Sequence, residues 1–124
     1  MTRETYSTTS RAAAHVQRTI ARTNGTVRLE VRRDGYLLAA HALRGDDLAH
    51  MEVAHAIATC GRPAFVRRVA VLTRPRHVEL EIIASTGRVL VARFERGALV
   101  HAYDLAADEL EPLARAVADA REAT

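Results

Sequence analysis

The chain has 124 residues, 48% of them hydrophobic and 27% charged, so it is long enough to bury one core and unlike a disordered segment in composition. Its single cysteine, Cys60, excludes an intrachain disulfide, and no run approaches the roughly 18 uninterrupted apolar residues of a membrane span. All 18 basic residues are arginine, and with abundant alanine this is typical of a GC-rich bacterial coding sequence. We therefore expect a cytoplasmic bacterial protein without a membrane association.

The pattern at the N-terminus predicts a flexible tail over residues 1–9 and a helix over residues 10–22. Ser10 is a suitable helix N-cap, and Asn24-Gly25 can supply the left-handed end that a helix favours. From Val27 onward apolar and charged residues alternate with period two, and Asp34-Gly35 is a strong signal for a two-residue hairpin turn. We therefore expect a β-hairpin up to about residue 42.

The remainder of the sequence predicts a helix, four strands and a last helix. Gly45-Asp46-Asp47 opens the middle helix, which runs to Cys60 and is closed by Gly61 and Pro63. Four strand-like runs follow, near 64–73, 77–84, 88–94 and 98–103, with short links that favour an antiparallel meander. Asp108 with Glu111 is a capping-box-like start for a last helix to about Arg121.

These elements predict one domain over residues 10–124 with the order α-ββ-α-ββββ-α and no internal repeat. The fold class that we expect is α+β, with an antiparallel sheet of five to six strands covered by helices.

A basic stripe is the first candidate for a binding site. On the predicted first helix, spacings of four, three and four place four residues on one face, Arg11, His15, Arg18 and Arg22. The charge is also lopsided, because residues 1–76 hold 13 arginines against 6 acidic residues and residues 77–124 hold 5 against 9. The stripe could contact phosphates of a nucleic acid, and the alternative is the solvated face of an ordinary amphipathic helix.

No catalytic, cofactor or metal site is predicted. His50 and His55 are five residues apart and diverge by about 140° around a helix, so they cannot form the zinc pair of a metalloprotease helix. Cys60 lies at a helix C-terminus, which lacks the dipole that lowers a thiol pKa. The alternating Glu79 and Glu81 indicate the solvated face of a strand.

The middle helix has two apolar faces, and this predicts a dimer. Val53, Ile57 and Cys60 cluster on one side, whereas a second set lies almost opposite, Leu48, Met51 and His55. One face should pack on the sheet of the same chain. The other could be covered by another helix of the chain or by the same helix of a second copy across a two-fold axis, and we favour the second copy.

From these observations we expect a non-catalytic binding, adaptor or regulatory domain that forms a homodimer. A second protein is a possible further partner. The alternative is a nucleic-acid-associated protein that uses the arginine-rich first helix. A small enzyme of unknown class is the third hypothesis.

Overall fold

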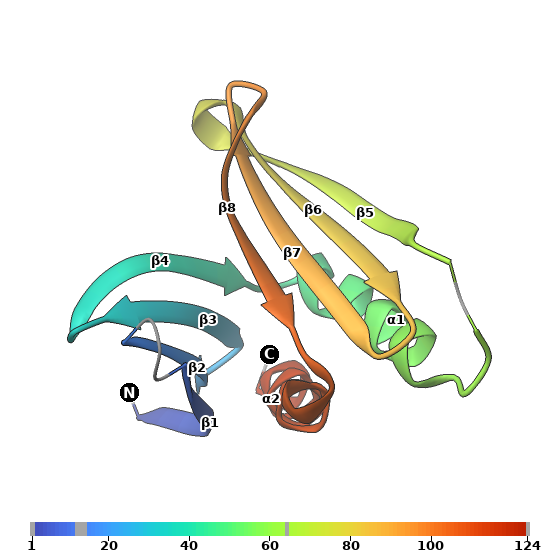
Figure 1. Cartoon of the computed structure of the whole chain (residues 1–124), viewed down its shortest axis with the longest axis horizontal. Coiled ribbons are helices and arrows are strands. Elements are labelled where there is room, and N and C mark those ends of the chain that lie inside the picture. The colour runs from blue at the N-terminus through green and yellow to red at the C-terminus, as the bar shows by residue number, and fades with distance from the viewer. Residues whose placement is uncertain (1, 12–14, 64, 124) are drawn as a thin grey trace. The chain divides into compact units, whose positions relative to one another are not determined.

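The computed structural model describes residues 2–11, 15–63 and 65–123 of the chain. Within them lie eight strands, two α-helices and one short 3-10 helix (Figure 1). The first half contains β1 (Arg3–Arg11), β2 (Val16–Thr23), β3 (Thr26–Arg33), β4 (Tyr36–Leu43) and α1 (Asp46–Thr59). The second half contains β5 (Arg67–Arg74), the 3-10 helix η2 (Pro75–His77), β6 (Val78–Ser85), β7 (Arg88–Glu95), β8 (Ala98–Leu105) and α2 (Ala107–Glu122).

The prediction of a first helix over residues 10–22 is wrong, and so is the fold class built on it. The chain forms two four-stranded antiparallel sheets, with strand orders β1-β2-β3-β4 and β5-β6-β7-β8, rather than one sheet of five to six strands. The described part of the predicted helix is the end of β1 and most of β2, and residues 3–9, expected to be a tail, lie in β1. Here tertiary pairing with β3 overrides the helical spacing of the basic residues and the helix-capping residues.

Several other predicted elements are confirmed. The hairpin with the Asp34-Gly35 turn is β3 and β4, and the middle helix is α1. The four later strand-like runs correspond to β5, β6, β7 and β8, and they form the expected meander.

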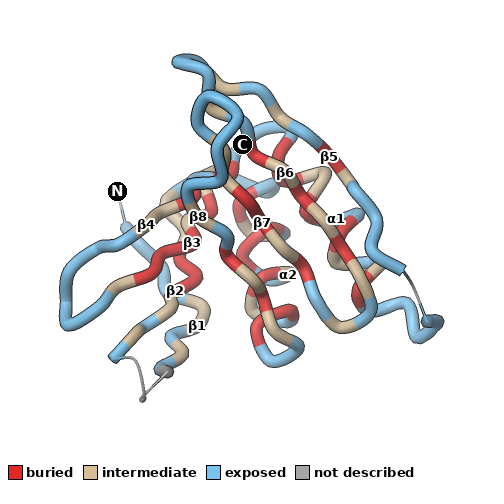
Figure 2. The backbone as a smooth tube through the Cα atoms, turned by 45° about the horizontal axis from the view of Figure 1, so that its top comes forward, coloured by how far each residue is buried: buried red, intermediate tan, exposed pale blue. Residues whose placement is uncertain are grey.

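The chain divides into two compact units, and each combines one sheet with one helix from the other half of the sequence. The first unit comprises residues 1–48 and 111–124, hence β1–β4 with most of α2. The second unit comprises residues 49–110, hence most of α1 with β5–β8. Buried positions alternate with half-buried or exposed positions along several strands of both sheets (Figure 2). Each sheet therefore has an inner face, which carries the core, and an outer face.

The two halves repeat the same structure at a spacing of 62 residues, which the sequence analysis missed. His15 and His77 both have a positive φ, and their carbonyls accept equivalent backbone hydrogen bonds from Asp34 and Arg96. The register of β3 with β4 shifts after Val31, and that of β7 with β8 shifts at the equivalent place. The chain is therefore a tandem repeat of four strands followed by one helix.

The first unit buries apolar side chains from the inner face of its sheet and from α2. The largest contributions from the sheet are completely buried, Ile20, Val27, Leu29 and Leu43. From α2 come four buried residues at helical spacing, Leu113, Ala116, Val117 and Ala120. These spacings of three, one and three place the side chains on one stripe of the helix, as a single sheet face requires.

The second unit has an equivalent core. The sheet buries side chains at the alternate positions of its strands, Leu80, Ile82, Ala84, Val89, Val91, Tyr103 and Leu105, and α1 buries Met51, Ala54 and Ala58. The backbone N–H of Gly87 donates to the carbonyl of Ala58 at 2.8 Å, which fixes the end of α1 to the turn between β6 and β7.

Both helices begin in the same way, with a buried carboxylate four residues after the end of the preceding strand. The Oδ2 atom of Asp47 accepts the backbone N–H of Arg44 at 3.1 Å, and Oε1 of Glu109 accepts that of Ala106 at 3.1 Å. This is the reach-back half of a capping box, and in α2 the residue is Glu109 instead of the expected Glu111. Oε2 of Glu109 also accepts a hydrogen bond of 3.1 Å from the hydroxyl of buried Tyr103.

Candidate functional site

The outer face of the second sheet is apolar at its centre. Strand pairing places β6, β7 and β8 side by side, and the alternate positions opposite the core bring together Ile83, Leu90, Ala92, Phe94, Leu99 and Ala102. Leu99 is 60% exposed, and Val71 on the neighbouring β5 is 44% exposed. A cluster of apolar side chains on a surface marks a place where another molecule can bind.

A groove of about 210 Å³ lies on this face where β6 ends and β7 begins. It is lined by Val66, Ile83, Ser85, Arg88, Leu90 and Asp104. Two ion pairs flank the apolar centre. Arg88 donates to the Asp104 carboxylate through both Nε, at 3.3 Å, and Nη2, and Arg68 Nε lies 3.0 Å from Glu81 Oε1. The hydrogen bond to Asp104 raises the pKa of Arg88.

The segment between α1 and β5 adds two exposed apolar residues to the second unit. Phe65 is 92% exposed and Val66 is 72% exposed. A second hollow, of about 300 Å³, is lined by Gly61, Pro63, Phe65 and Thr86. The hydroxyl of Thr86 donates to the carbonyl of Arg62 at 3.3 Å, which ties this segment to the turn between β6 and β7.

The outer face of the first sheet has a different chemistry at equivalent positions. Arg28, Glu30 and Arg32 of β3 stand where β7 has Leu90, Ala92 and Phe94. The Glu30 side chain is 2% exposed and pairs with Arg3 and Arg28. The outer face is therefore charged on β3 of the first sheet and apolar on β7 of the second, whereas β4 and β8 are both apolar at equivalent outward positions, Leu37 and Ala40 in one and Leu99 and Ala102 in the other.

The predicted basic stripe is not a helix face, because its residues lie in two strands and a turn. Arg11 ends β1, His15 lies in the turn before β2, and Arg18 and Arg22 are alternate residues of β2. Arg18 and Arg22 pair with Val31 and Val27 in the antiparallel register, so they lie on the inner face of the sheet.

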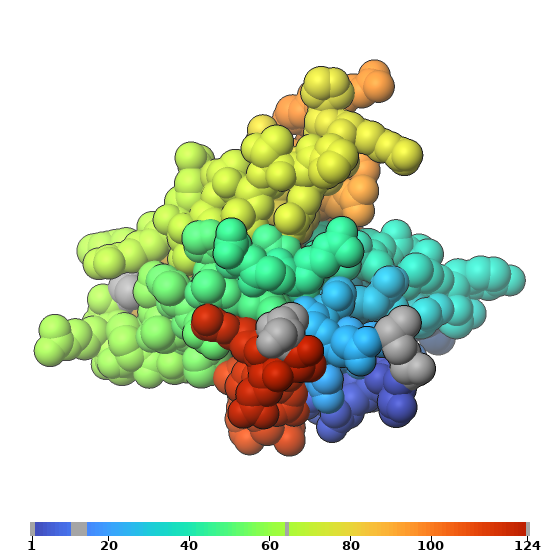
Figure 3. All heavy atoms as spheres, turned by 180° about the vertical axis from the view of Figure 1, so that it is seen from behind, coloured from blue at the N-terminus to red at the C-terminus, as the bar shows by residue number. Residues whose placement is uncertain are grey.

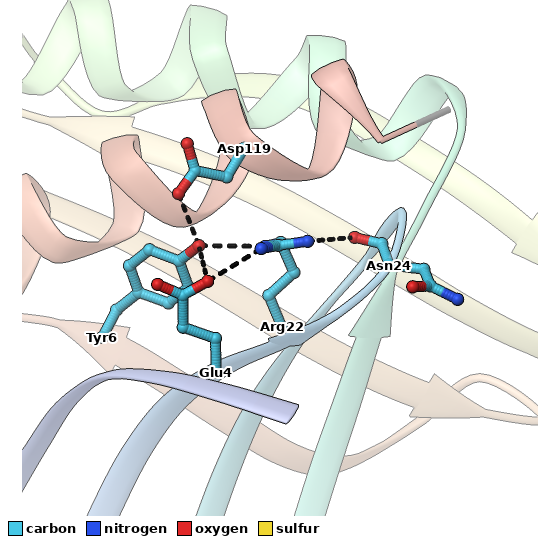
Figure 4. A network of polar contacts seen from close by, with 5 residues as sticks. All are labelled: Glu4, Tyr6, Arg22, Asn24 and Asp119. Atoms are coloured by element: carbon cyan, nitrogen blue, oxygen red, sulfur yellow. Dashed lines mark hydrogen bonds and ion pairs between the residues drawn. The ribbon is translucent and has the colours of Figure 1, made fainter. Parts of the chain in front are cut away.

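Arg22 belongs to a network that joins β1, β2 and α2 within the first unit (Figure 4). Its Nε donates to the Tyr6 hydroxyl at 2.9 Å, and its Nη2 donates to Glu4 Oε2 at 2.8 Å. The Tyr6 hydroxyl in turn donates to Asp119 Oδ2 on α2 at 2.6 Å. Burial, followed by the hydrogen bond to Asp119, raises the pKa of Tyr6. This network is structural, because it fixes α2 to the edge strand β1.

The face of α1 that predicted a dimer is already covered within the chain. Leu48 is 1% exposed and Met51 is 0% exposed, whereas His55 is half-buried. The opposite apolar face is the more open one, because Val53 is 51% exposed. In the space-filling view α1 forms part of the molecular surface (Figure 3). Leu48 and Met51 are therefore core residues, and they give no reason to place a second copy against them.

The histidines and the cysteine that were considered for metal binding and catalysis lie on α1 or directly after it. His50 is half-buried on α1, and Cys60 follows the same helix and is exposed. Across residues 2–11, 15–63 and 65–123, no three His, Cys, Asp or Glu side chains group as metal ligands would. In the same part of the chain, neither helix has the length and apolar character needed to cross a membrane.

Sequence reasoning missed both outer faces as sites. The signal for the apolar face was present, because Leu90 and Phe94 alternate with Val89 and Val91, so that β7 is apolar on both sides. A strand with two apolar faces needs a packing partner on each face. In the second unit α1 packs on one face only. The signal for the charged face was the alternation of arginine with apolar residues in β3.

The comparisons with known proteins give no family: no protein-family model matches the sequence, and no curated protein or solved structure is significantly similar to it.

Proposed function

We propose that the protein is a non-catalytic binding or adaptor module that works as a homodimer, with the outer face of the second sheet as the subunit interface. The observation that carries this proposal is the apolar centre of that face. Leu90, Ala92 and Phe94 occupy positions that are charged in the equivalent sheet of the same chain. Burial of such a face between two sheets about 10 Å apart is the packing of a β-sandwich.

A second copy of the chain fits this face because the charges around its apolar centre are of both signs. Two arginines and three carboxylates surround the apolar centre, namely Arg68, Arg88, Glu79, Glu81 and Asp104. A two-fold axis would place the apolar centre against itself and each rim against charges of both signs. The outer face of the first sheet carries a net positive charge, so it would repel a copy of itself.

The test is the oligomeric state of the purified chain. Wild-type protein should sediment as a dimer at high micromolar concentration, and Leu90→Asp should sediment as a monomer with an unchanged circular dichroism spectrum. Leu99→Asp is a second variant at a more exposed position, where an unfolded product is less expected. Val53→Asp is the matched control, because it places the same charge on an exposed apolar position of α1.

Two outcomes would overturn the proposal. One is a wild-type chain that sediments as a monomer across this concentration range. The other is a dimer that persists in both Leu90→Asp and Leu99→Asp while Val53→Asp dissociates, because the interface would then lie on α1.

A further inference from the structure

The outer face of the first sheet concentrates positive charge around one buried carboxylate. Glu30 lies in the middle of β3, and its side chain is 2% exposed. Arg3 Nη2 donates to Glu30 Oε1 from β1, and Arg28 Nε donates to Oε2 at 3.2 Å from the same strand. The guanidinium of Arg32 also acts on Glu30 through its charge. Three cations therefore surround one anion.

The arginines remain open to solvent on their other side. The Arg3 side chain is 43% exposed and that of Arg28 is 39% exposed. A guanidinium has five N–H donors in a fixed fork, and the hydrogen bonds to Glu30 use only part of them. Glu30 thus holds the two side chains in place while other donors face outward, which reduces the entropy that a ligand must overcome to order them.

The other outward side chains of β1 and β2 are mostly of the kind that contact phosphates and sugars, whereas β4 contributes apolar outward positions, Leu37, Ala40 and Ala42. On β1 and β2 the outward positions are hydroxyl or amide residues apart from the small Ala21, and they are Thr5, Thr8, Ser10, Gln17, Thr19 and Thr23. Among the described residues of the four strands, Glu30 is the one carboxylate in the outward register. The part of this face that β1, β2 and β3 form therefore offers many hydrogen-bond donors.

The spread of the cations indicates a polymer rather than a single ion. The guanidiniums of Arg3 and Arg28 meet at Glu30, whereas Arg32, whose Cα lies about 13 Å along the strand from that of Arg28, donates to the Gly35 carbonyl in the turn at the end of β3. A phosphate bound at Arg3 and Arg28 would not reach Arg32 as well, whereas a chain of phosphates can contact both places at once.

We propose that the outer face of the first sheet binds the phosphate backbone of nucleic acid without sequence preference. The positions that carry it are Arg3, Arg28 and Arg32. The outward positions of β1, β2 and β3 include no aromatic side chain on which a base could stack, so contacts to phosphate would supply the affinity. This surface and the proposed dimer interface belong to different units, and either proposal can fail without the other.

The test measures binding of fluorescently labelled single-stranded and double-stranded DNA by anisotropy over a series of salt concentrations. Wild-type protein should bind two unrelated sequences equally, and its affinity should fall steeply with salt. The double variant R28Q/R32Q should bind at least tenfold more weakly. On duplex DNA, the slope of log affinity against log salt should flatten by about 0.9 for each phosphate that an arginine no longer neutralises, hence by about two.

The matched control is R67Q/R96Q, which removes two exposed arginines from the second unit and should bind as wild type does. Arg32→Gln alone is a milder variant, because Arg32 donates its hydrogen bond of 3.5 Å to the Gly35 carbonyl and not to Glu30. This variant should flatten the slope of log affinity against log salt by about one. A wild-type chain that shows no binding at low salt would overturn the inference. Equal weakening by both double variants would do the same, as would binding to anionic phospholipid vesicles but not to DNA.

Discussion

The two sheets share one architecture but differ in what they expose. The inner positions keep their apolar character across the repeat, as in Leu43 and Leu105, which are both completely buried. The outer positions do not, because the charged centre of β3 is replaced by an apolar centre in β7. Packing against a helix constrains only one face of each sheet. The other face can change chemistry without loss of the fold, and this freedom gives one small chain two different surfaces.

The largest effect should come from the inner faces, where the two halves are equivalent. Leu43→Ala and Leu105→Ala each remove a completely buried side chain, so each should lower the free energy of unfolding by about 2–5 kcal/mol. Chemical denaturation of the two variants beside wild type is the measurement. Outer-face changes such as Thr8→Ala should cost less than about 0.5 kcal/mol. A loss of less than about 1 kcal/mol for either leucine would show that the two cores are not equivalent.

Two substitutions can give the outer face of the second sheet the arginines of the first. The double variant L90R/F94R gives the second sheet the arginines that the first sheet has at Arg28 and Arg32. We expect the dimer dissociation constant to rise at least 100-fold, because like charges would face each other across the two-fold axis. Binding to DNA should strengthen, since the second face would then also be basic. Sedimentation and anisotropy on the same preparation measure both, and an intact dimer would contradict the proposed interface.

The third prediction concerns pH and the one carboxylate of the charged face. The hydrogen bond from Arg3, followed by the charges of Arg3, Arg28 and Arg32, lowers the pKa of Glu30 against the opposing effect of burial. Ionised Glu30 therefore stabilises the folded state above its unfolded pKa of about 4.3, and this stabilisation is lost as the pH falls through the lower, folded pKa. This stabilisation should be about 1 kcal/mol, because Arg3 and Arg28, the two arginines that pair with Glu30, are partly exposed to solvent.

Glu30→Gln measures this contribution. At neutral pH the variant should unfold at a lower denaturant concentration than wild type, and the difference should shrink as the pH falls below about 4. Ala92, the equivalent residue of the second sheet, cannot titrate, so Ala92→Ser is a control whose difference from wild type should be the same at each pH. A gap between wild type and Glu30→Gln that grows on acidification would show that Glu30 does not stabilise the fold as an anion.

Most strands and both helices could be predicted from the sequence, whereas the first two strands could not. In β2 the inward positions alternate between apolar and arginine, as in Ile20 and Arg22, so the period of two is hidden. Arg22 is tolerated inward because Tyr6, Glu4 and Asp119 form a polar network around it, and those partners come from other elements. Local spacing cannot reveal such a network, and the helical spacing of Arg11, His15, Arg18 and Arg22 therefore prevailed in the prediction.

The repeat could have been found from the sequence, but the binding surfaces only in part. His15 and His77, and the turn glycines Gly35 and Gly97, recur at the same spacing with the same backbone conformation. The two apolar faces of α1 were recognised, but which of them is buried depends on the fold, and Leu48 turned out to be core. Likewise the arginines of β3 were visible, but their grouping around Glu30 needs β1, which was predicted as a tail.

The smallest effect should come from the two hairpin turns, which share a backbone and differ in one residue. Asp34-Gly35 has φ values of 49° and 83°, and Arg96-Gly97 has 52° and 82°. Asp and Asn tolerate the left-handed conformation better than a long side chain such as Arg does, because their short polar groups can bond to the local backbone.

Arg96→Asn should therefore raise the free energy of unfolding by about 0.5 kcal/mol, and Asp34→Arg should lower it by about the same amount. The Arg96-Gly97 turn belongs to the second unit, so Arg96→Asn should leave the affinity for DNA as in wild type. Asp34→Arg replaces a negative charge by a positive one two residues from Arg32, so it should strengthen binding to DNA. Thermal unfolding of the two variants and of the combined variant measures the effect, and the combined variant should return to wild-type stability. If Arg96→Asn destabilises the chain instead, the Arg96 side chain makes a favourable contact that outweighs the strain of its backbone, and the two turns are equivalent in shape but not in energy.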